Sequence, residues 1–121
     1  MTIINNVLVA AREETGHVVV PETVTAIGDH AFMYSDIESI ELPNTLVSIG
    51  YCAFSHCANL KSIVIPENVT EISYGAFSCC ENLECIYVPS TIKDILTGDK
   101  FSHCKNLKKI ILTISLDVKY Y

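Results

Sequence analysis

One thirteen-residue pattern returns along the chain at a nearly fixed interval. It runs from Val20 to Phe32 and returns from Leu42 to Phe54 and from Ile65 to Phe77, and a less regular copy runs from Val88 to Phe101. Their prolines Pro21, Pro43, Pro66 and Pro89 are 22, 23 and 23 residues apart. A repeat of this length predicts a solenoid, in which each coil buries its apolar face against its neighbours.

The third copy indicates how one coil is built. Ile63 and Ile65 flank Val64 with the alternation that is typical of a β-strand. Pro66 ends this strand, because proline has no N–H to give to a hydrogen-bond ladder. A second extended segment follows, and residues 76–80 are long enough only for a helical turn. We therefore predict about four coils of 22–24 residues, mostly β with short helical turns.

Stacked coils align equivalent residues into columns that are spaced about 4.8 Å apart. We expect three apolar columns to form the core: Phe32, Phe54, Phe77 and Phe101; Ile40, Ile63, Ile86 and Ile110; and Ile27, Ile49, Ile72 and Ile95. A polar column, Thr23, Thr45, Asn68 and Thr91, follows the prolines. Its short side chains are expected to bond backbone groups at that corner.

Both ends of the repeat array depart from the pattern, as terminal coils of solenoids commonly do. We expect residues 1–19 to form an N-terminal capping hairpin, in which residues 5–9 and 18–20 flank a polar turn. The repeats then occupy residues 20–112. Residues 113–121 continue an alternation that begins at Ile110, and they are predicted to form a C-terminal strand or cap of the same domain.

Composition argues against several classes of partner. Half of the residues are hydrophobic, which is enough to build a core, and only 18% are charged. The net charge of −6, with only eight Lys and Arg, argues against nucleic acid. No run approaches the ~20 apolar residues of a membrane-spanning helix, so no membrane insertion is expected. No signal peptide is visible, because the first residues lack a basic start followed by an apolar run.

The pattern Leu-x-x-Ile-x-Ile-Pro-x-x-Val-x-x-Ile-x-x-x-Ala-Phe-x-x-Cys-x-x-Leu resembles the BspA-like leucine-rich repeats of bacterial and protist proteins. The resemblance covers about residues 20–112, where the Pro, Ala-Phe and Cys positions recur together. It implies a right-handed, slightly curved solenoid. It also implies a class of mostly secreted or cell-surface proteins that bind host or matrix proteins, and it implies no catalytic residues.

Two further columns hold cysteine and histidine. Cys57, Cys80 and Cys104 occupy the repeat's own cysteine position and are expected to be small buried hydrophobes with free thiols. The adjoining column, Tyr34, His56, Cys79 and His103, has side chains that suit zinc or a Cys–His nucleophile pair. Their spacing follows from stacking and no C-x-x-C motif occurs, so we favour exposed polar residues and expect no metal, cofactor or catalysis.

Recognition is expected on the outward side of the strands. One outward column, Glu38, Lys61, Glu84 and Lys108, alternates in sign and predicts a ladder of cross-strand charge pairs. The other, Glu41, Val64, Tyr87 and Ile111, is largely apolar and is the predicted contact surface. Four strands give a face of roughly 300 Å², below the ~800 Å² that each partner of a stable complex buries.

These observations favour a non-catalytic protein-binding module for adhesion or interaction, with an unidentified protein partner. The alternative is a structural or self-associating scaffold fragment, a homodimer joined through its apolar C-terminal edge. A metal-binding protein or an enzyme that uses the column of His56, Cys79 and His103 is a distant third hypothesis.

Overall fold

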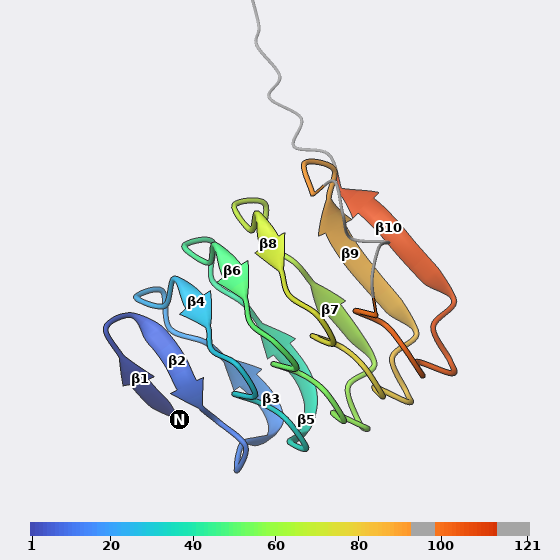
Figure 1. The fold of residues 1–121 in the computed structure, drawn as a ribbon, viewed down its shortest axis with the longest axis horizontal. Helices are drawn as coiled ribbons and strands as arrows, with labels where there is room; N and C mark the ends of the chain where they lie inside the picture. The colour runs from blue at the N-terminus through green and yellow to red at the C-terminus, as the bar shows by residue number, and fades with distance from the viewer. Residues whose placement is uncertain (93–98, 114–121) are drawn as a thin grey trace, which may run out of the picture.

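A computed structural model describes residues 1–92 and 99–113 of the chain, which contain ten β-strands and no helix (Figure 1). The strands are β1 (Thr2–Ile4), β2 (Val7–Ala10), β3 (Thr15–Val19), β4 (Ala26–Ile27), β5 (Asp36–Glu41), β6 (Ser48–Ile49), β7 (Ser62–Val64), β8 (Glu71–Ile72), β9 (Cys85–Pro89) and β10 (Lys109–Thr113). They wind into a solenoid of about four coils, as the repeat predicts.

The strands form three sheets along the solenoid. The five-stranded sheet has the order β1-β2-β4-β6-β8, the three-stranded sheet β10-β9-β7, and the two-stranded sheet β3-β5. Strand β5 also contacts β7, so that β3, β5, β7, β9 and β10 lie side by side (Figure 1). We call the outward side of these five strands the strand face.

The predicted core columns are present. Pairing of β7, β9 and β10 puts Ile63 opposite Ile86 and Ile86 opposite Ile110. Pairing of β4, β6 and β8 aligns Ile27, Ile49 and Ile72 in the same way, and all three side chains are buried. The predicted fourth member of this second column, Ile95, lies outside the described residues.

The phenylalanine column is the centre of the core. Phe32, Phe54 and Phe77 are completely buried, whereas Phe101 in the last described coil is only partly buried. Successive rings stack nearly parallel, with centroids 5.0, 5.3 and 5.6 Å apart. The rings of Phe54 and Phe77 therefore pack against the coils on both of their sides, which is how one repeat stabilises the next.

The prediction of the N-terminal hairpin was wrong about which segments pair. The antiparallel pair is β1 with β2, which turns at Asn5 and Asn6, two residues with positive φ of 49° and 65°. Asparagine tolerates this conformation and favours two-residue hairpin loops. Strand β3, expected to pair with residues 5–9, instead pairs in parallel with β5. It does so because buried Val18 lies opposite Ile40, so β3 already begins the first coil.

The third side of each coil consists of tight turns instead of the predicted helical turns. In the first coil, the N–H of Ala31 donates to the Gly28 carbonyl over 3.2 Å, as in a turn. The next N–H, that of Phe32, donates to Ala53 of the following coil over 2.7 Å. Since alternate N–H groups bond between coils, they are not free to form a helix.

Two side chains of the polar column at the proline corner, Thr45 and Asn68, bond backbone carbonyls as predicted. The hydroxyl of Thr45 donates to the Val24 carbonyl over 2.8 Å, and the amide of Asn68 donates to Asn44 over 2.9 Å. The charge ladder differs from the prediction. Its four side chains are exposed, and within residues 1–92 and 99–113 none of them forms an ion pair with another.

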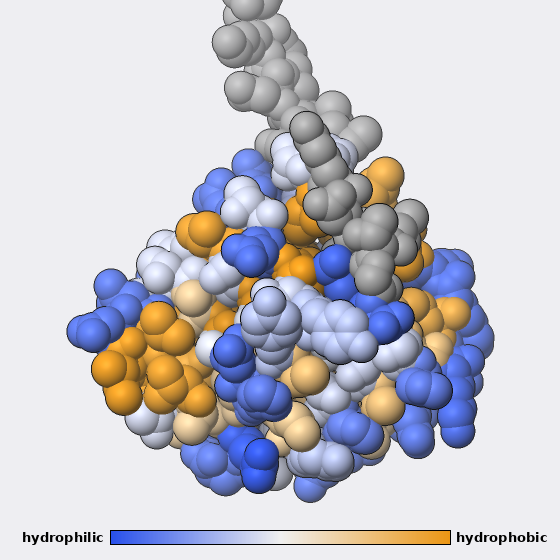
Figure 2. Space-filling view, in the orientation of Figure 1, coloured by the Kyte–Doolittle hydropathy of each residue, from blue (hydrophilic) through white to orange (hydrophobic). Residues whose placement is uncertain are grey.

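Apolar surface remains at the start of the array. Figure 2 shows an apolar area over β1, the edge of the five-stranded sheet, where Ile3 and Ile4 are 36% and 56% exposed. The described residues include no helix with the length and apolar character needed to cross a bilayer.

Candidate functional site

Three of the predicted contact residues are neighbours on the strand face. Val64 pairs with Tyr87, and Tyr87 pairs with Ile111. Val64 is 57% exposed, Ile111 is 36% exposed and Tyr87 is half-buried. Parallel pairing puts their side chains on the same side of the sheet, so they form one apolar strip across β7, β9 and β10.

A groove of about 250 Å³ runs beside this strip. It is lined by Glu84, Cys85, Tyr87, Lys108, Lys109 and Ile111. A hydrogen bond with the neighbouring thiol of Cys85 raises the pKa of the Tyr87 hydroxyl above its usual value. Where the strip crosses β9 and β10, it therefore borders charged and polar side chains, namely Glu84, Cys85, Lys108 and Lys109.

The fourth predicted residue, Glu41, lies apart from this groove and pairs with Val19 across β3 and β5. One ring nitrogen of His17, Nδ1, is 2.6 Å from the Ser39 hydroxyl, and the other, Nε2, is 3.4 Å from the carboxylate of Glu41. These contacts join β3 to β5 on the strand face. We call them the histidine clasp.

The clasp contains the residue types that activate a serine nucleophile, but Ser39 faces Nδ1 and Glu41 faces Nε2, the reverse of the arrangement in a catalytic triad. The side chains of His17 and Glu41 are 55% and 67% exposed, so solvent reaches the whole arrangement. Nucleophilic catalysis relies on donors held in a site that excludes water. An open clasp on a flat sheet instead suits a link between two strands.

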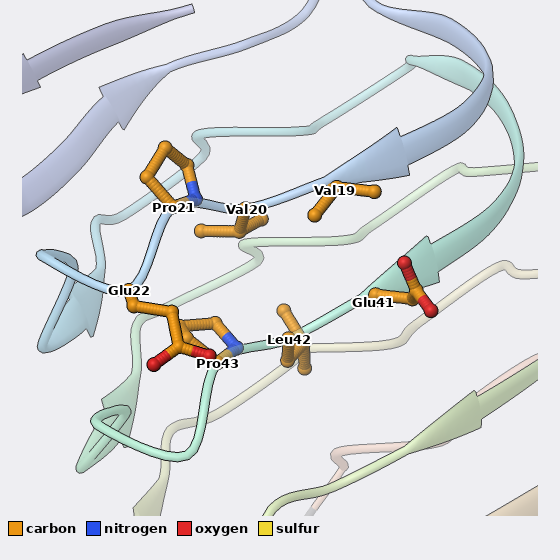
Figure 3. Close-up of a pocket in the computed structure, with 7 residues that line it drawn as sticks. All are labelled: Val19, Val20, Pro21, Glu22, Glu41, Leu42 and Pro43. Atoms are coloured by element: carbon orange, nitrogen blue, oxygen red, sulfur yellow. The ribbon is translucent and has the colours of Figure 1, made fainter.

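A second pocket, of about 320 Å³, lies between the ends of β3 and β5 (Figure 3). We call it the proline-corner pocket, and its lining residues are Val19, Val20, Pro21, Glu22, Glu41, Leu42 and Pro43. In Figure 3 the carboxylates of Glu22 and Glu41 lie at opposite ends of the pocket, with Val20 and Leu42 between them.

The column with His56, Cys79 and His103 is explained by its backbone. Tyr34 and these three residues all have positive φ, between 58° and 64°. Histidine is enriched among non-glycine residues in this conformation. The N–H groups of Tyr34, His56 and Cys79 donate to carbonyls of the next coil over 2.8–3.0 Å. This geometry holds the coils in register, and the rings of Tyr34 and His56 also stack, with centroids 4.4 Å apart.

No metal centre or nucleophile pair is assembled in this column by the described residues. Across residues 1–92 and 99–113, no group of three or more His, Cys, Asp or Glu side chains is placed to hold a metal ion. No hydrogen bond links the side chains of Cys79 and His103 in that part of the chain.

The cysteine column has a structural role that the sequence does not reveal. The thiols of Cys57, Cys80 and Cys104 donate to the carbonyls of Phe32, Phe54 and Phe77, respectively, over 3.0–3.1 Å. All six cysteines of the chain are free. Burial raises the pKa of the Cys57 thiol to about 12 and also raises that of Cys80. These thiols stay protonated near neutral pH and act as donors between coils.

Sequence reasoning missed the residues that complete the N-terminal part of the strand face. Val19 is 58% exposed and extends the column that contains Glu41 by one coil. Aligning Val19-Val20-Pro21 with Glu41-Leu42-Pro43 would have found it. The partners of His17 had no such signal, because a bulge between Gly16 and His17 shifts the register there.

Known proteins share this architecture. The family model for the BspA-type leucine-rich repeat region matches residues 9–120 with six copies. A leucine-rich cell-surface protein from Faecalibacterium prausnitzii is 28% identical over 86% of this chain and 33% of its own, with a TM-score of 0.64. A leucine-rich repeat protein from Bacteroides capillosus is 25% identical over 80% of this chain and 76% of its own, with a TM-score of 0.71.

A leucine-rich repeat protein from Eubacterium ventriosum shares the fold, with a TM-score of 0.73 at 24% identity. The match covers 89% of this chain and 30% of that protein, so the chain spans about a third of this relative and of the Faecalibacterium protein. A comparison with curated proteins finds no match. Because the family model covers nearly all of the repeats, the chain belongs to the BspA-type leucine-rich repeat family.

Proposed function

We propose that this chain is a non-catalytic protein-binding module that contacts its partner through the strand face. The observation that carries the proposal is the exposed strip of Val64, Tyr87 and Ile111 on three paired strands. A regular sheet presents these side chains without rearrangement, and aromatic residues are enriched among the residues that dominate binding energy. The likeness to a leucine-rich cell-surface protein supports a location at the cell surface. An extracellular host or matrix protein as partner is what the resemblance to BspA-like repeats implies, and it is part of this proposal.

The size of the strand face limits how the module binds. Five strands about 4.8 Å apart and about 17 Å long offer roughly 400 Å². A stable complex buries about 800 Å² on each partner. The module therefore binds together with its turn edges or with further repeats, or it binds weakly and transiently.

The test is binding to a panel of purified extracellular-matrix proteins by surface plasmon resonance. Replacing Val64, Tyr87 and Ile111 together with serine should leave the circular dichroism spectrum unchanged and weaken binding at least tenfold. The matched control replaces the same residue types elsewhere: Val47, Tyr51 and Ile4, which are 45%, 54% and 56% exposed. Equal binding by the parent chain and the strand-face variant would contradict the proposal.

A self-associating scaffold is the second candidate function. Strand β10 is the edge of its three-stranded sheet, and Leu112 on it is 59% exposed. An apolar edge strand can pair with a second copy. Sedimentation velocity over a hundredfold range of concentration separates the two, because a strict monomer excludes the scaffold.

A further inference from the structure

We propose that the proline-corner pocket receives an arginine side chain of the partner protein. The inference rests on the proposed protein-binding function, and it adds the chemistry of one contact. The pocket's volume of about 320 Å³ is at the small end for ligand sites. It therefore suits one side chain better than a free ligand.

The walls of the pocket match the two parts of an arginine. The exposed side chains of Val19 and Pro21 and the partly buried Leu42 give the pocket an apolar wall for the methylene stem, whereas Val20 and Pro43 are buried. Long basic side chains cover apolar surface with their stems while their heads stay near water. The carboxylates of Glu22 and Glu41 stand at the two ends (Figure 3), so a cationic head meets one of them whichever way the stem runs.

The charges around the pocket favour a cation. None of its seven lining residues is basic. Residues 1–60 contain seven acidic residues and a single Arg or Lys, Arg12, whereas residues 61–121 contain seven of each sign. The Nε of Arg12 donates to the Met33 carbonyl over 3.1 Å, so this base is bound on another part of the coil. The N-terminal half of the protein therefore attracts a cationic group and repels anions.

Both glutamates have carboxylate acceptor sites open to a new partner, although Glu41 also belongs to the histidine clasp. Glu22 is exposed and forms no hydrogen bond or ion pair with the described residues. Among the described residues, the carboxylate of Glu41 has one polar partner, Nε2 of His17 at 3.4 Å, which leaves most of its acceptor sites open. A guanidinium group suits this arrangement better than an ammonium group, because its planar fork can bond a carboxylate through two N–H groups. A purely apolar occupant would have to desolvate both carboxylates at a cost in free energy.

The probe is n-butylguanidinium, which reproduces an arginine side chain, titrated into the full ¹⁵N-labelled chain and followed by amide chemical shifts. The uncharged n-butylurea has nearly the same shape and is the control ligand. We expect saturable shifts confined to the amides of the non-proline lining residues Val19, Val20, Glu22, Glu41 and Leu42, with at least tenfold weaker binding of the urea. Equal binding of both probes, or shifts spread over the acidic surface without saturation, would overturn the inference.

Two variants locate the contact. Glu22→Gln with Glu41→Gln should reduce the affinity for n-butylguanidinium at least tenfold, whereas Glu38→Gln with Glu71→Gln should not change it. Both controls replace exposed glutamates outside the pocket. Unchanged binding by the first variant refutes the site. Because the probe needs no protein partner, its failure leaves the protein-binding proposal standing, and failure of the protein panel alone leaves the pocket standing.

Discussion

Phe54 provides a direct test of how the coils stabilise one another. Its ring is completely buried between those of Phe32 and Phe77, with centroids 5.0 and 5.3 Å away. Replacing Phe54 with alanine opens a cavity that both neighbouring coils line. Buried Phe→Ala substitutions cost about 3–5 kcal/mol, and a stack with both faces occupied is expected at the upper end of this range.

Phe101 is the matched control, because it occupies the same position in the last described coil. It is only partly buried, and in the described part of the chain its one ring neighbour is Phe77, at 5.6 Å. Phe101→Ala is therefore expected to cost about 2.5 kcal/mol, half of the cost at Phe54. The difference depends only on place in the stack, because the residue removed is the same.

Urea unfolding measures both free energies. The chain has six tyrosines and no tryptophan, so tyrosine fluorescence and circular dichroism report the transition. A domain with 5–15 kcal/mol of stability still folds after the larger loss, provided that its stability is not at the lower limit. Equal losses for Phe54→Ala and Phe101→Ala would refute the reasoning, because they would show that stacking between coils does not set the cost.

Two further predictions concern the thiols and the close contact between coils. Because the pKa of Cys57 rises from 9.0 to about 12 on folding, its contribution to stability is full below pH 9 and is lost as the pH rises toward 12. Urea titrations at about pH 8 and pH 10.5 should show this decline, and Cys57→Ala should make it shallower; an identical decline in both proteins would contradict it. A Cβ at Gly50 would lie 2.5 Å from Asp29 Oδ1 and 2.8 Å from its backbone nitrogen, so Gly50→Ala should cost about 1–3 kcal/mol. Ser73→Ala, at the equivalent place in the next coil, should change the free energy of unfolding by less than about 0.5 kcal/mol in the same assay, and similar costs at both positions would exclude the clash as the cause.

Gly50 also shows why some features could not be predicted from the sequence. The Asp29 carboxylate accepts the Tyr51 N–H over 2.9 Å and thereby occupies the space next to Gly50. One coil further on, Tyr51 occupies the position equivalent to Asp29, and the residue that stacks next to it, Ser73, occupies the position equivalent to Gly50. The pattern of residues records this change, but the hydrogen bond that causes it exists only between stacked coils.

The cysteine and histidine columns illustrate the same limit. From sequence, Cys57, Cys80 and Cys104 could be assigned to the interior by their place in the repeat. That their thiols donate hydrogen bonds to phenylalanine carbonyls one coil earlier could be seen only in the structure. Likewise His56 and His103 were weak candidates for metal ligands in the sequence, where exposed polar residues were favoured, and their positive φ of 59° shows that the backbone of the turn accounts for them.

The sequence by itself determined the solenoid, its period and its inward columns, because a repeat places equivalent residues one above another whatever the details of the turns. It also identified the strip of Val64, Tyr87 and Ile111, since strand alternation decides which side chains point outward. The tertiary structure alone decided what happens where the repeat is broken. The bulge between Gly16 and His17 shifts the register of β3 against β5 and aligns His17 with Ser39, which gives the histidine clasp beside the proline-corner pocket. Those contacts depend on the register between segments, which the order of residues along the chain does not state.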